Sequence, residues 1–306
     1  MDQMGPAGLT TCPGAPSPWG YMRIRAIVAA VSGALALSAF AVPAAQAEDG
    51  RSWNLDHRFT GTQPSSGEDS QRAFAAAAAT DAKITSAVVN GGKPIVVGTK
   101  SKQTVPYTVT ATDDSGIAGA AAFIWIGQSI DDEESFGFGP NEKSVSCKAV
   151  NATTTTCKGT ITLNPAEMLN SDATWWRVGV FAGANDGEEL ERESVSKVRV
   201  QRFSKLTVNA SPEPVKKGKT ITVTGKLTRA NWDTATYKGY SKQSVKLQFK
   251  KKGAKSYSTV KTVKTSSTGT LKTTVKASSD GTWRYSFVGT PSTSAVSATG
   301  DYLDVK

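Results

Sequence analysis

The chain has 306 residues, a formal net charge of +10 at pH 7, three cysteines and one histidine. The single histidine, His57, lies between Asp56 and Arg58 in a segment where nothing would hold its geometry. This argues against a Ser-His-Asp catalytic arrangement and against an imidazole-ligated zinc site. Acidic residues are numerous enough for glycoside hydrolysis, but no pattern sets two of them across a cleft. We therefore expect a protein that is not an enzyme.

Residues 1–47 predict a leader that contains a signal peptide. Positive charges at 23–25 precede an apolar run at 26–42, and Ala45-Gln46-Ala47 forms a small-residue cleavage site. Met22 is the expected true start. The apolar run is short and weak for a bilayer span, so no transmembrane segment is expected in the mature chain. With no sorting motif or hydrophobic tail at the end of the sequence, we expect a secreted protein, extracellular or non-covalently associated with the cell wall.

Residues 48–83 predict a flexible arm rich in Ala, Ser and Gly. Its alanine run at 74–79 has no apolar stripe, and a short helix of that kind is marginal in water.

Charge divides the remaining chain into two parts. Residues 84–203 carry 11 Lys and Arg against 14 Asp and Glu, whereas residues 204–306 carry 19 against five. This break in composition predicts an acidic domain followed by a basic domain.

From residue 84 onward, apolar side chains recur with a period of two, which predicts half-buried β-strands. Seven strands are expected in the first domain, at residues 84–89, 105–111, 121–126, 145–149, 157–163, 175–182 and 195–200. One or two helical turns are expected at Asn164-Pro165, because Asn is a good N-cap and Pro suits the first helical position.

The second domain repeats this plan with cleaner alternation. Seven strands are expected at residues 205–210, 221–227, 245–249, 257–263, 271–275, 283–287 and 302–305. The fold class predicted is therefore all-β, with two tandem immunoglobulin-like antiparallel β-sandwiches after the signal peptide and the arm. Only a few residues separate Val200 from Leu206, so a stiff connection is expected.

Two cysteines remain after the leader, Cys147 and Cys157. An even pair in an oxidising compartment predicts a disulfide. Closing this short loop stabilises the fold by roughly 2 to 3 kcal/mol. Metal ligation by two thiolates alone would need partners that the chain lacks.

Three segments of the basic domain resemble bacterial immunoglobulin-like domains of secreted actinobacterial proteins. They are Lys217-Gly218-Lys219-Thr220 with the following strand to Gly225, then Val245 to Phe249, and Gly281 to Tyr285. Residues 112–117 resemble another immunoglobulin-type module, although the cysteines are too close together for the inter-sheet pair of antibody domains. The resemblance implies the fold and no activity. Some proteins of this kind are labelled calcium-binding.

Acidic loops of the first domain are candidate calcium ligands, because calcium takes six to eight oxygen ligands. The candidates are Asp113, Asp114, Asp131, Asp132, Asp186 and Glu188. No EF-hand spacing occurs. The alternative is that these loops are simply solvated, with Asp113 and Gly116 as the first and last residues of a type I turn. No other cofactor is expected.

Lysines of the second domain predict a polyanion-binding face. Lys outnumbers Arg there by 17 to two, which suits diffuse attraction to phosphates or carboxylates more than specific recognition of nucleic-acid bases. Expected partners are anionic wall polymers such as teichoic acids, acidic polysaccharides, or the acidic loops of the first domain. The alternative is that these lysines only prevent edge-to-edge aggregation. The candidates are Lys246, Lys250, Lys251, Lys252, Lys255, Lys261, Lys264 and Lys272.

Aromatic residues add a further alternative. Trp176 and Trp283 share strand faces with apolar residues and are expected in the cores. Trp175, and the loop residues Trp232, Tyr237 and Tyr240, either form a carbohydrate platform or pack beneath the loop.

Taken together, these features lead us to expect a secreted, non-enzymatic binding or structural protein whose basic domain contacts an anionic polymer. Calcium binding is the first alternative, and carbohydrate binding or an unrecognised enzyme activity is the second.

Overall fold

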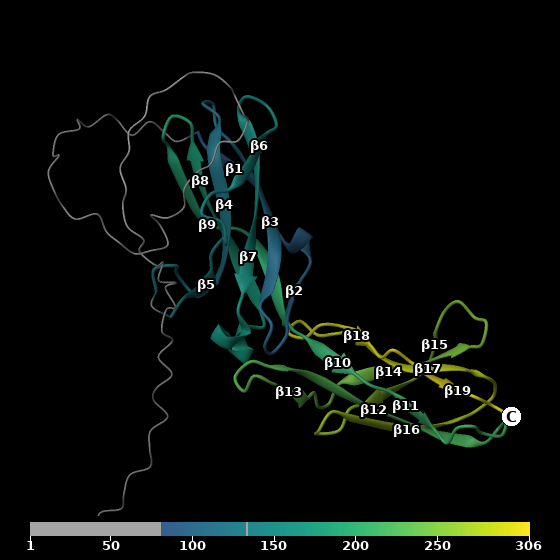
Figure 1. Ribbon diagram of the computed structural model, residues 1–306. Helices are drawn as coiled ribbons and strands as arrows, with labels where there is room; N and C mark the ends of the chain where they lie inside the picture. The colour runs from purple at the N-terminus through teal and green to yellow at the C-terminus, as the bar shows by residue number, and fades with distance from the viewer. Residues whose placement is uncertain (1–80, 133) are drawn as a thin grey trace, which may run out of the picture.

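The computed structural model describes residues 81–132 and 134–306, which form 19 β-strands and three short 3-10 helices (Figure 1). The predicted leader, almost all of the predicted arm and His57 lie outside the described residues. In the described part, no helix has the length and apolar character needed to cross a membrane.

The first sandwich contains two sheets, in which every strand pair except one is antiparallel. One sheet has the strand order β1-β3-β7-β6 and the other β2-β9-β8-β4-β5, with β2 parallel to β9. This order matches the ABED and GFC sheets of the immunoglobulin fold. Its strands are β1 (Lys83–Val89), β2 (Ile95–Val97), β3 (Gln103–Thr112), β4 (Ile117–Ile126), β5 (Phe136–Phe138), β6 (Ser146–Ala149), β7 (Thr154–Leu163), β8 (Trp175–Ala184) and β9 (Glu189–Arg202).

All seven expected strands of this part are present, and β2 and β5 are additional. Each additional strand has three residues, too few for an alternating pattern to be recognised. Three 3-10 helices complete the sandwich: η1 (Asn90–Gly92), η2 (Pro165–Glu167) and η3 (Asn170–Asp172). The helical turn predicted at Asn164 is confirmed as η2, where the Asn164 side chain accepts a hydrogen bond from the Ala166 amide at 3.2 Å.

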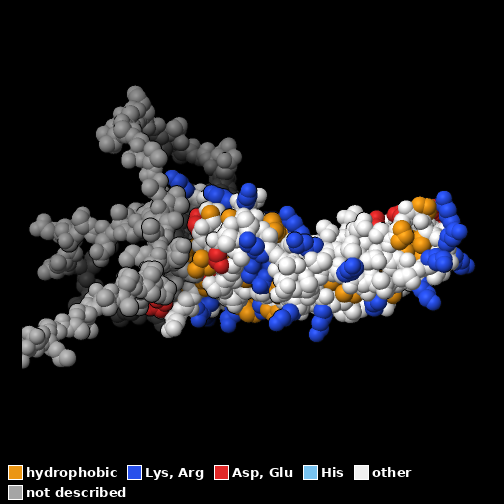
Figure 2. All heavy atoms as spheres, turned by 90° about the horizontal axis from the view of Figure 1, so that it is seen from below, with side chains coloured by type: hydrophobic (Ala, Val, Ile, Leu, Met, Phe, Trp, Pro, Cys, Tyr) orange, Lys and Arg blue, Asp and Glu red, His pale blue; other side chains and the backbone are white. Residues whose placement is uncertain are grey.

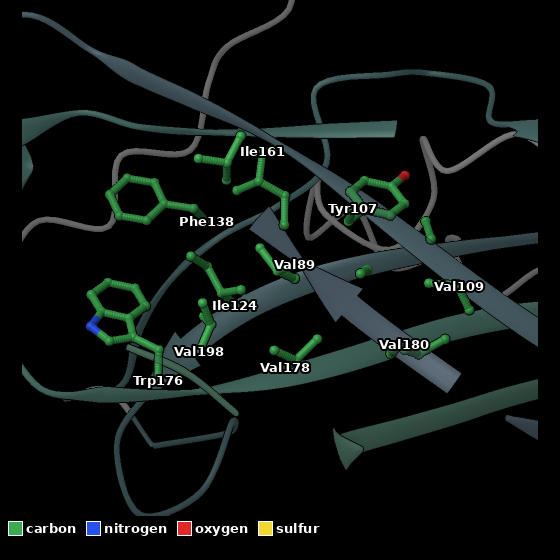
Figure 3. Close-up of a cluster of buried hydrophobic side chains, with 14 of the residues drawn as sticks. Val89, Tyr107, Val109, Ile124, Phe138, Ile161, Trp176, Val178, Val180 and Val198 are labelled. Atoms are coloured by element: carbon green, nitrogen blue, oxygen red, sulfur yellow. The ribbon is translucent and has the colours of Figure 1, made fainter. Parts of the chain in front are cut away.

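The core of the first sandwich lies between its sheets. Inward-facing residues of β3 and β7 alternate with exposed or half-buried ones, whereas β8 is buried throughout from Val178 to Ala184. Figure 3 shows the buried side chains converging. Trp176, fully buried as expected, stacks on Phe138 with 5.6 Å between ring centroids. Cys147 on β6 lies opposite Cys157 on β7, and the predicted disulfide joins them.

Only Phe203 separates the last strand of the first sandwich, which ends at Arg202, from the first strand of the second, which begins at Ser204. In one sheet β12 pairs with β10, β11, β13 and β16, and the other sheet has the order β15-β14-β17-β18 with β19 also paired to β17. Its strands are β10 (Ser204–Leu206), β11 (Asn209–Ser211), β12 (Thr220–Asn231), β13 (Thr236–Gly239), β14 (Ser244–Lys251), β15 (Ser258–Lys264), β16 (Thr270–Lys276), β17 (Gly281–Phe287), β18 (Val296–Ser297) and β19 (Asp301–Leu303).

Two features of this sandwich differ from the expectation. The strand predicted at 205–210 is divided into β10 and β11, and the long loop predicted after residue 227 is instead the paired end of β12 with β13. The core matches the alternation, with Trp283 and Tyr285 buried. The Tyr285 hydroxyl donates to the Val223 carbonyl at 3.0 Å, and burial raises the pKa of Tyr285 to about 12.

A shared junction joins the two sandwiches. Trp232, from the β12–β13 turn, is 4% exposed and packs in the core of the first sandwich. Its Nε1 donates to the Gly98 carbonyl at 2.7 Å, and its backbone amide donates to Asn170 Oδ1 at 3.0 Å. Arg202, buried at the end of β9, donates from Nε to the Ala230 carbonyl. The sandwiches therefore meet end to end through packed side chains, with their strands running in different directions (Figure 1).

Candidate functional site

Five carboxylates gather at the end of the first sandwich that points away from the second. They come from the residues just before β1, the β3–β4 turn and the β8–β9 turn (Figure 1). The ligand atoms of Asp81, Asp113 and Asp114 lie within 4.8 Å of one another, as do those of Asp113, Asp186 and Glu188. We call these five residues the acidic cluster; Asp113 belongs to both groups.

Asp113 is the buried centre of the acidic cluster, with 2% of its surface exposed. Its Oδ1 accepts hydrogen bonds from the Ser115 amide at 2.8 Å and the Ser115 hydroxyl at 2.5 Å. The Gly116 amide donates to the Asp113 carbonyl at 3.0 Å, which closes the expected turn. The second carboxylate oxygen, Oδ2, is buried and has no hydrogen-bond donor among the described residues. Burial of a charged oxygen without a partner is costly.

Hydrogen bonds tie the β8–β9 turn to the β3–β4 turn. The Asn185 amide donates to the Gly116 carbonyl at 2.9 Å, and the Asp186 amide donates to the Ser115 hydroxyl at 3.3 Å. The Glu188 amide in turn donates to Asp186 Oδ1 at 3.0 Å. These bonds hold carboxylates from two distant parts of the sequence close together.

The electrostatics of the acidic cluster are repulsive. Burial raises the pKa of Glu188, and the neighbouring carboxylates, led by Asp113, raise it further. The pKa of Asp81 is raised in the same way, by burial and then by Asp114 and Asp113. Within residues 81–132 and 134–306, no Lys or Arg forms an ion pair with any of the five. The negative charge is therefore not compensated by these residues.

The acidic cluster differs from the predicted ligand set in two ways. Asp131 and Asp132 lie in the β4–β5 loop, at the other end of ten-residue β4, which is a distance of about 30 Å. Asp132 Oδ2 accepts from the Ser129 amide within that loop. Asp81 was missed because it fell in the predicted arm. The pairing of Lys83 with Thr112 places Asp81 across from Asp114, and this register is not readable from the sequence.

Lysines gather at the free end of the second sandwich, where Figure 2 shows a group of Lys and Arg side chains. Backbone hydrogen bonds join the segments that carry them, from the Lys217 amide to the Lys306 carbonyl at 2.7 Å and from the Ala277 amide to the Lys219 carbonyl at 2.8 Å. We call this surface the basic end. Its members, all exposed, are Lys216, Lys217, Lys219, Lys251, Lys252, Lys255, Lys276 and Lys306.

One carboxylate is built into the basic end. Asp280 accepts a hydrogen bond from the Val305 amide at 2.9 Å and pairs with Lys252 at 3.4 Å. The Val305 amide, followed by Lys252, holds the pKa of Asp280 below its usual range. Asp280 thereby anchors the last residues of the chain among the lysines.

The eight predicted polyanion-binding lysines do not share one face. Lys251, Lys252 and Lys255 belong to the basic end. The others lie on strands of both sheets: Lys246 and Lys250 on β14, Lys261 and Lys264 on β15, and Lys272 on β16.

Sequence reasoning missed the lysines of the β11–β12 loop. The readable signal was a repeated Lys-Lys-Gly turn, at Lys216-Lys217-Gly218 and again at Lys251-Lys252-Gly253. Both glycines have positive φ, 79° and 81°, a conformation that favours glycine. Because the two turns are far apart in the sequence, the sequence alone does not indicate that they lie at the same end of the sandwich.

The aromatic platform, one of the two alternatives for these residues, is not assembled. Trp232 is buried in the junction, Tyr237 packs edge-on against Phe203, and Tyr240 packs edge-on against Phe287. Trp175 is 52% exposed, with the Arg199 guanidinium 4.1 Å from its ring centroid. Trp232, Tyr237 and Tyr240 therefore pack against other residues, which was the other reading, whereas Trp175 stays exposed.

Comparison with known proteins gives one family match and no activity. Residues 96–182, less than half of the chain, match a family described as "Family of unknown function (DUF5707)". No curated protein matches.

Three similar solved structures are bacterial. The fibronectin(III)-like modules of Clostridium thermocellum CbhA are 11% identical, with 73% of this chain and 92% of that chain covered and a TM-score of 0.28. The D00-D0 domain of Intimin is 12% identical, with 71% of this chain and 98% of that chain covered and a TM-score of 0.26. A putative membrane anchored protein from Corynebacterium diphtheriae is 11% identical, with 73% of this chain and 53% of that chain covered and a TM-score of 0.26. The strand order itself defines this chain as a tandem immunoglobulin-like β-sandwich protein.

Proposed function

We propose that this chain is a secreted, non-enzymatic binding protein whose basic end contacts an anionic polymer of the cell envelope. The observation that carries the proposal is the convergence of eight exposed lysines on one free end, from two loops, the ends of β14 and β16, and the C-terminal residue. Like charges held together raise the local positive potential, which attracts polyanions and weakens with salt.

The composition of the basic end favours a repeating anionic chain over a single specific group. Every cation in it is a lysine, a compact and mobile charge, whereas bidentate recognition of one phosphate or carboxylate favours arginine. Teichoic-acid-like phosphate polymers and acidic polysaccharides both have the required chemistry.

The acidic loops of the same molecule are not the partner of this surface. The acidic cluster lies at the far end of the first sandwich, and the junction lies between it and the basic end (Figure 1). Among the described residues, Lys252 with Asp280 is the ion pair found at the basic end. Most of its lysines are therefore available to an external ligand.

The test compares two charge-matched variants of the full mature chain. The first replaces four basic-end lysines that form no ion pair with another described residue: Lys216→Gln, Lys217→Gln, Lys251→Gln and Lys255→Gln. The control removes the same charge from the predicted lysines on the sheets: Lys246→Gln, Lys261→Gln, Lys264→Gln and Lys272→Gln. Affinity is measured for poly(glycerol phosphate) and for polygalacturonate, each over a NaCl series. Comparison of the two polymers distinguishes a preference for phosphate from a preference for carboxylate.

Four exposed contacts worth about 0.5 kcal/mol each sum to about 2 kcal/mol, a loss of about 30-fold in affinity. We expect this loss, with a weaker salt dependence, in the basic-end variant and a change below about threefold in the control. Equal losses in the two variants would contradict the assignment to the basic end. Absence of binding by the wild type to both polymers at low salt would contradict the function.

A further inference from the structure

The acidic cluster contains a buried charged atom that its surroundings do not satisfy. Asp113 Oδ2 lacks a hydrogen-bond donor in the described part of the chain, although its sister oxygen receives two hydrogen bonds from Ser115. Buried carboxylate oxygens are normally paired, hydrogen-bonded or bound to a metal. No Lys or Arg of the described residues pairs with this oxygen, and none of their N–H groups donates to it.

The surroundings of Asp113 add further negative charge instead of a positive partner. Asp186 and Glu188 approach it on one side, and Asp81 and Asp114 form a second group with it. Hydrogen bonds between the two turns hold these like charges together. A cation bound among them would supply the missing partner of Asp113 Oδ2 and remove the repulsion.

We propose that the acidic cluster binds a calcium ion, with Asp113 as the central ligand and with Asp186 and Glu188 as flanking ligands. All candidate ligand atoms are carboxylate oxygens, which hard cations prefer and which do not select zinc or copper. Calcium accepts irregular sets of six to eight oxygens, whereas magnesium requires near-ideal octahedral geometry. Ligands drawn from two separate turns suit the less demanding ion.

Calcium held by these three ligands would fasten the β3–β4 turn to the β8–β9 turn, beside the Asp81 that shares the other carboxylate group with Asp113. Asp81 precedes β1, Asp113 follows β3, and Asp186 lies between β8 and β9. A ligand that binds the folded state alone stabilises it by mass action. The acidic cluster lies at the opposite end of the molecule from the basic end (Figure 1), so calcium binding there is independent of polymer binding.

The test uses the full mature chain without any polymer. Calorimetric titration with CaCl₂ measures the affinity, and thermal unfolding in CaCl₂ or in EDTA measures the stabilisation. We expect saturable calcium binding and a rise in Tm of about 5 °C or more when calcium exceeds Kd a hundredfold. NaCl at equal ionic strength, and MgCl₂, should not reproduce the rise.

Three variants locate the site. Asp113→Asn keeps an acceptor for Ser115 while removing the buried charge, and Glu188→Gln changes a half-buried side chain. Each should weaken calcium binding at least about tenfold, since a ligand charge is lost. The control Asp131→Asn/Asp132→Asn removes acidic charge at the other end of β4 and should bind as the wild type does.

Three results would overturn the inference. The first is no heat and no change of Tm with millimolar calcium in the wild type. The second is an equal rise of Tm in NaCl, because the cluster would then only be screened. The third is calcium binding that survives Asp113→Asn and Glu188→Gln as well as it survives the control.

Discussion

Replacement of Trp232 by alanine tests whether the junction belongs to the core of the first sandwich. Trp232 lies in the sequence of the second sandwich, yet its side chain is 4% exposed and packs among residues of the first. Trp232→Ala should therefore destabilise the first sandwich although the changed residue lies beyond it in the chain. If the two sandwiches were joined only by a flexible tether, a replacement in the second sandwich would not change the stability of the first.

The magnitude follows from the packing of the indole. Replacing a buried Trp by Ala costs about 3–5 kcal/mol. For a folded part of this size, each kcal/mol shifts Tm by about 2–4 °C, so the expected decrease is about 6–20 °C. Trp232→Phe keeps an aromatic ring but loses the hydrogen bond to the Gly98 carbonyl, and we expect a smaller decrease.

Differential scanning calorimetry of the mature chain measures these shifts, and urea unfolding followed by circular dichroism checks them. Trp175→Ala is the matched control, because this residue is 52% exposed and its ring contacts Arg199 at the surface. Its expected cost is within about 1 kcal/mol. A decrease for Trp232→Ala no larger than that for Trp175→Ala would refute the reasoning about the junction.

Two further predictions concern the stability of each sandwich. Removing the disulfide with Cys147→Ala/Cys157→Ala should lower the free energy of unfolding by about 2–3 kcal/mol; urea unfolding measures it, and an unchanged midpoint would contradict it. Asp280 has a lowered pKa in the folded chain, so its contribution to stability is present above the ordinary pKa of an aspartate and is lost as the pH falls through the folded value. Asp280→Asn should therefore weaken the loss of stability on acidification, measured as unfolding free energy against pH; identical pH profiles would argue against this role.

The local alternation of apolar and polar residues was sufficient to predict most of the strands. Alternation such as Val105, Tyr107 and Val109 predicted buried positions correctly because each strand exposes its two faces differently. The alternation does not extend to three-residue strands such as β2 (Ile95–Val97), whose existence depends on pairing with β9. Residues 236–239 appeared to be a loop because their partner, the end of β12, extends beyond the alternating segment.

The candidate sites were less accessible to sequence reasoning. Residue types identified Asp113 and Asp186 as possible ligands, but only the turn contacts decided that they meet and that Asp131 lies elsewhere. The run Lys251-Lys252 was recognised as basic, and only the fold placed Lys217 beside the C-terminal residue of the same end.

By itself, the sequence determined the all-β class, the division of charge and the disulfide, because these depend on periodicity, composition and residue chemistry over short distances. The tertiary structure decided which loops share an end and what lies in the junction. Trp232 has the same local sequence whether it is exposed or buried, and the contact with Gly98 across the junction settles its environment. The acidic cluster likewise depends on the register of β1 against β3 and on the turn between β8 and β9, and contacts of such long sequence separation are specified by packing of the whole sandwich.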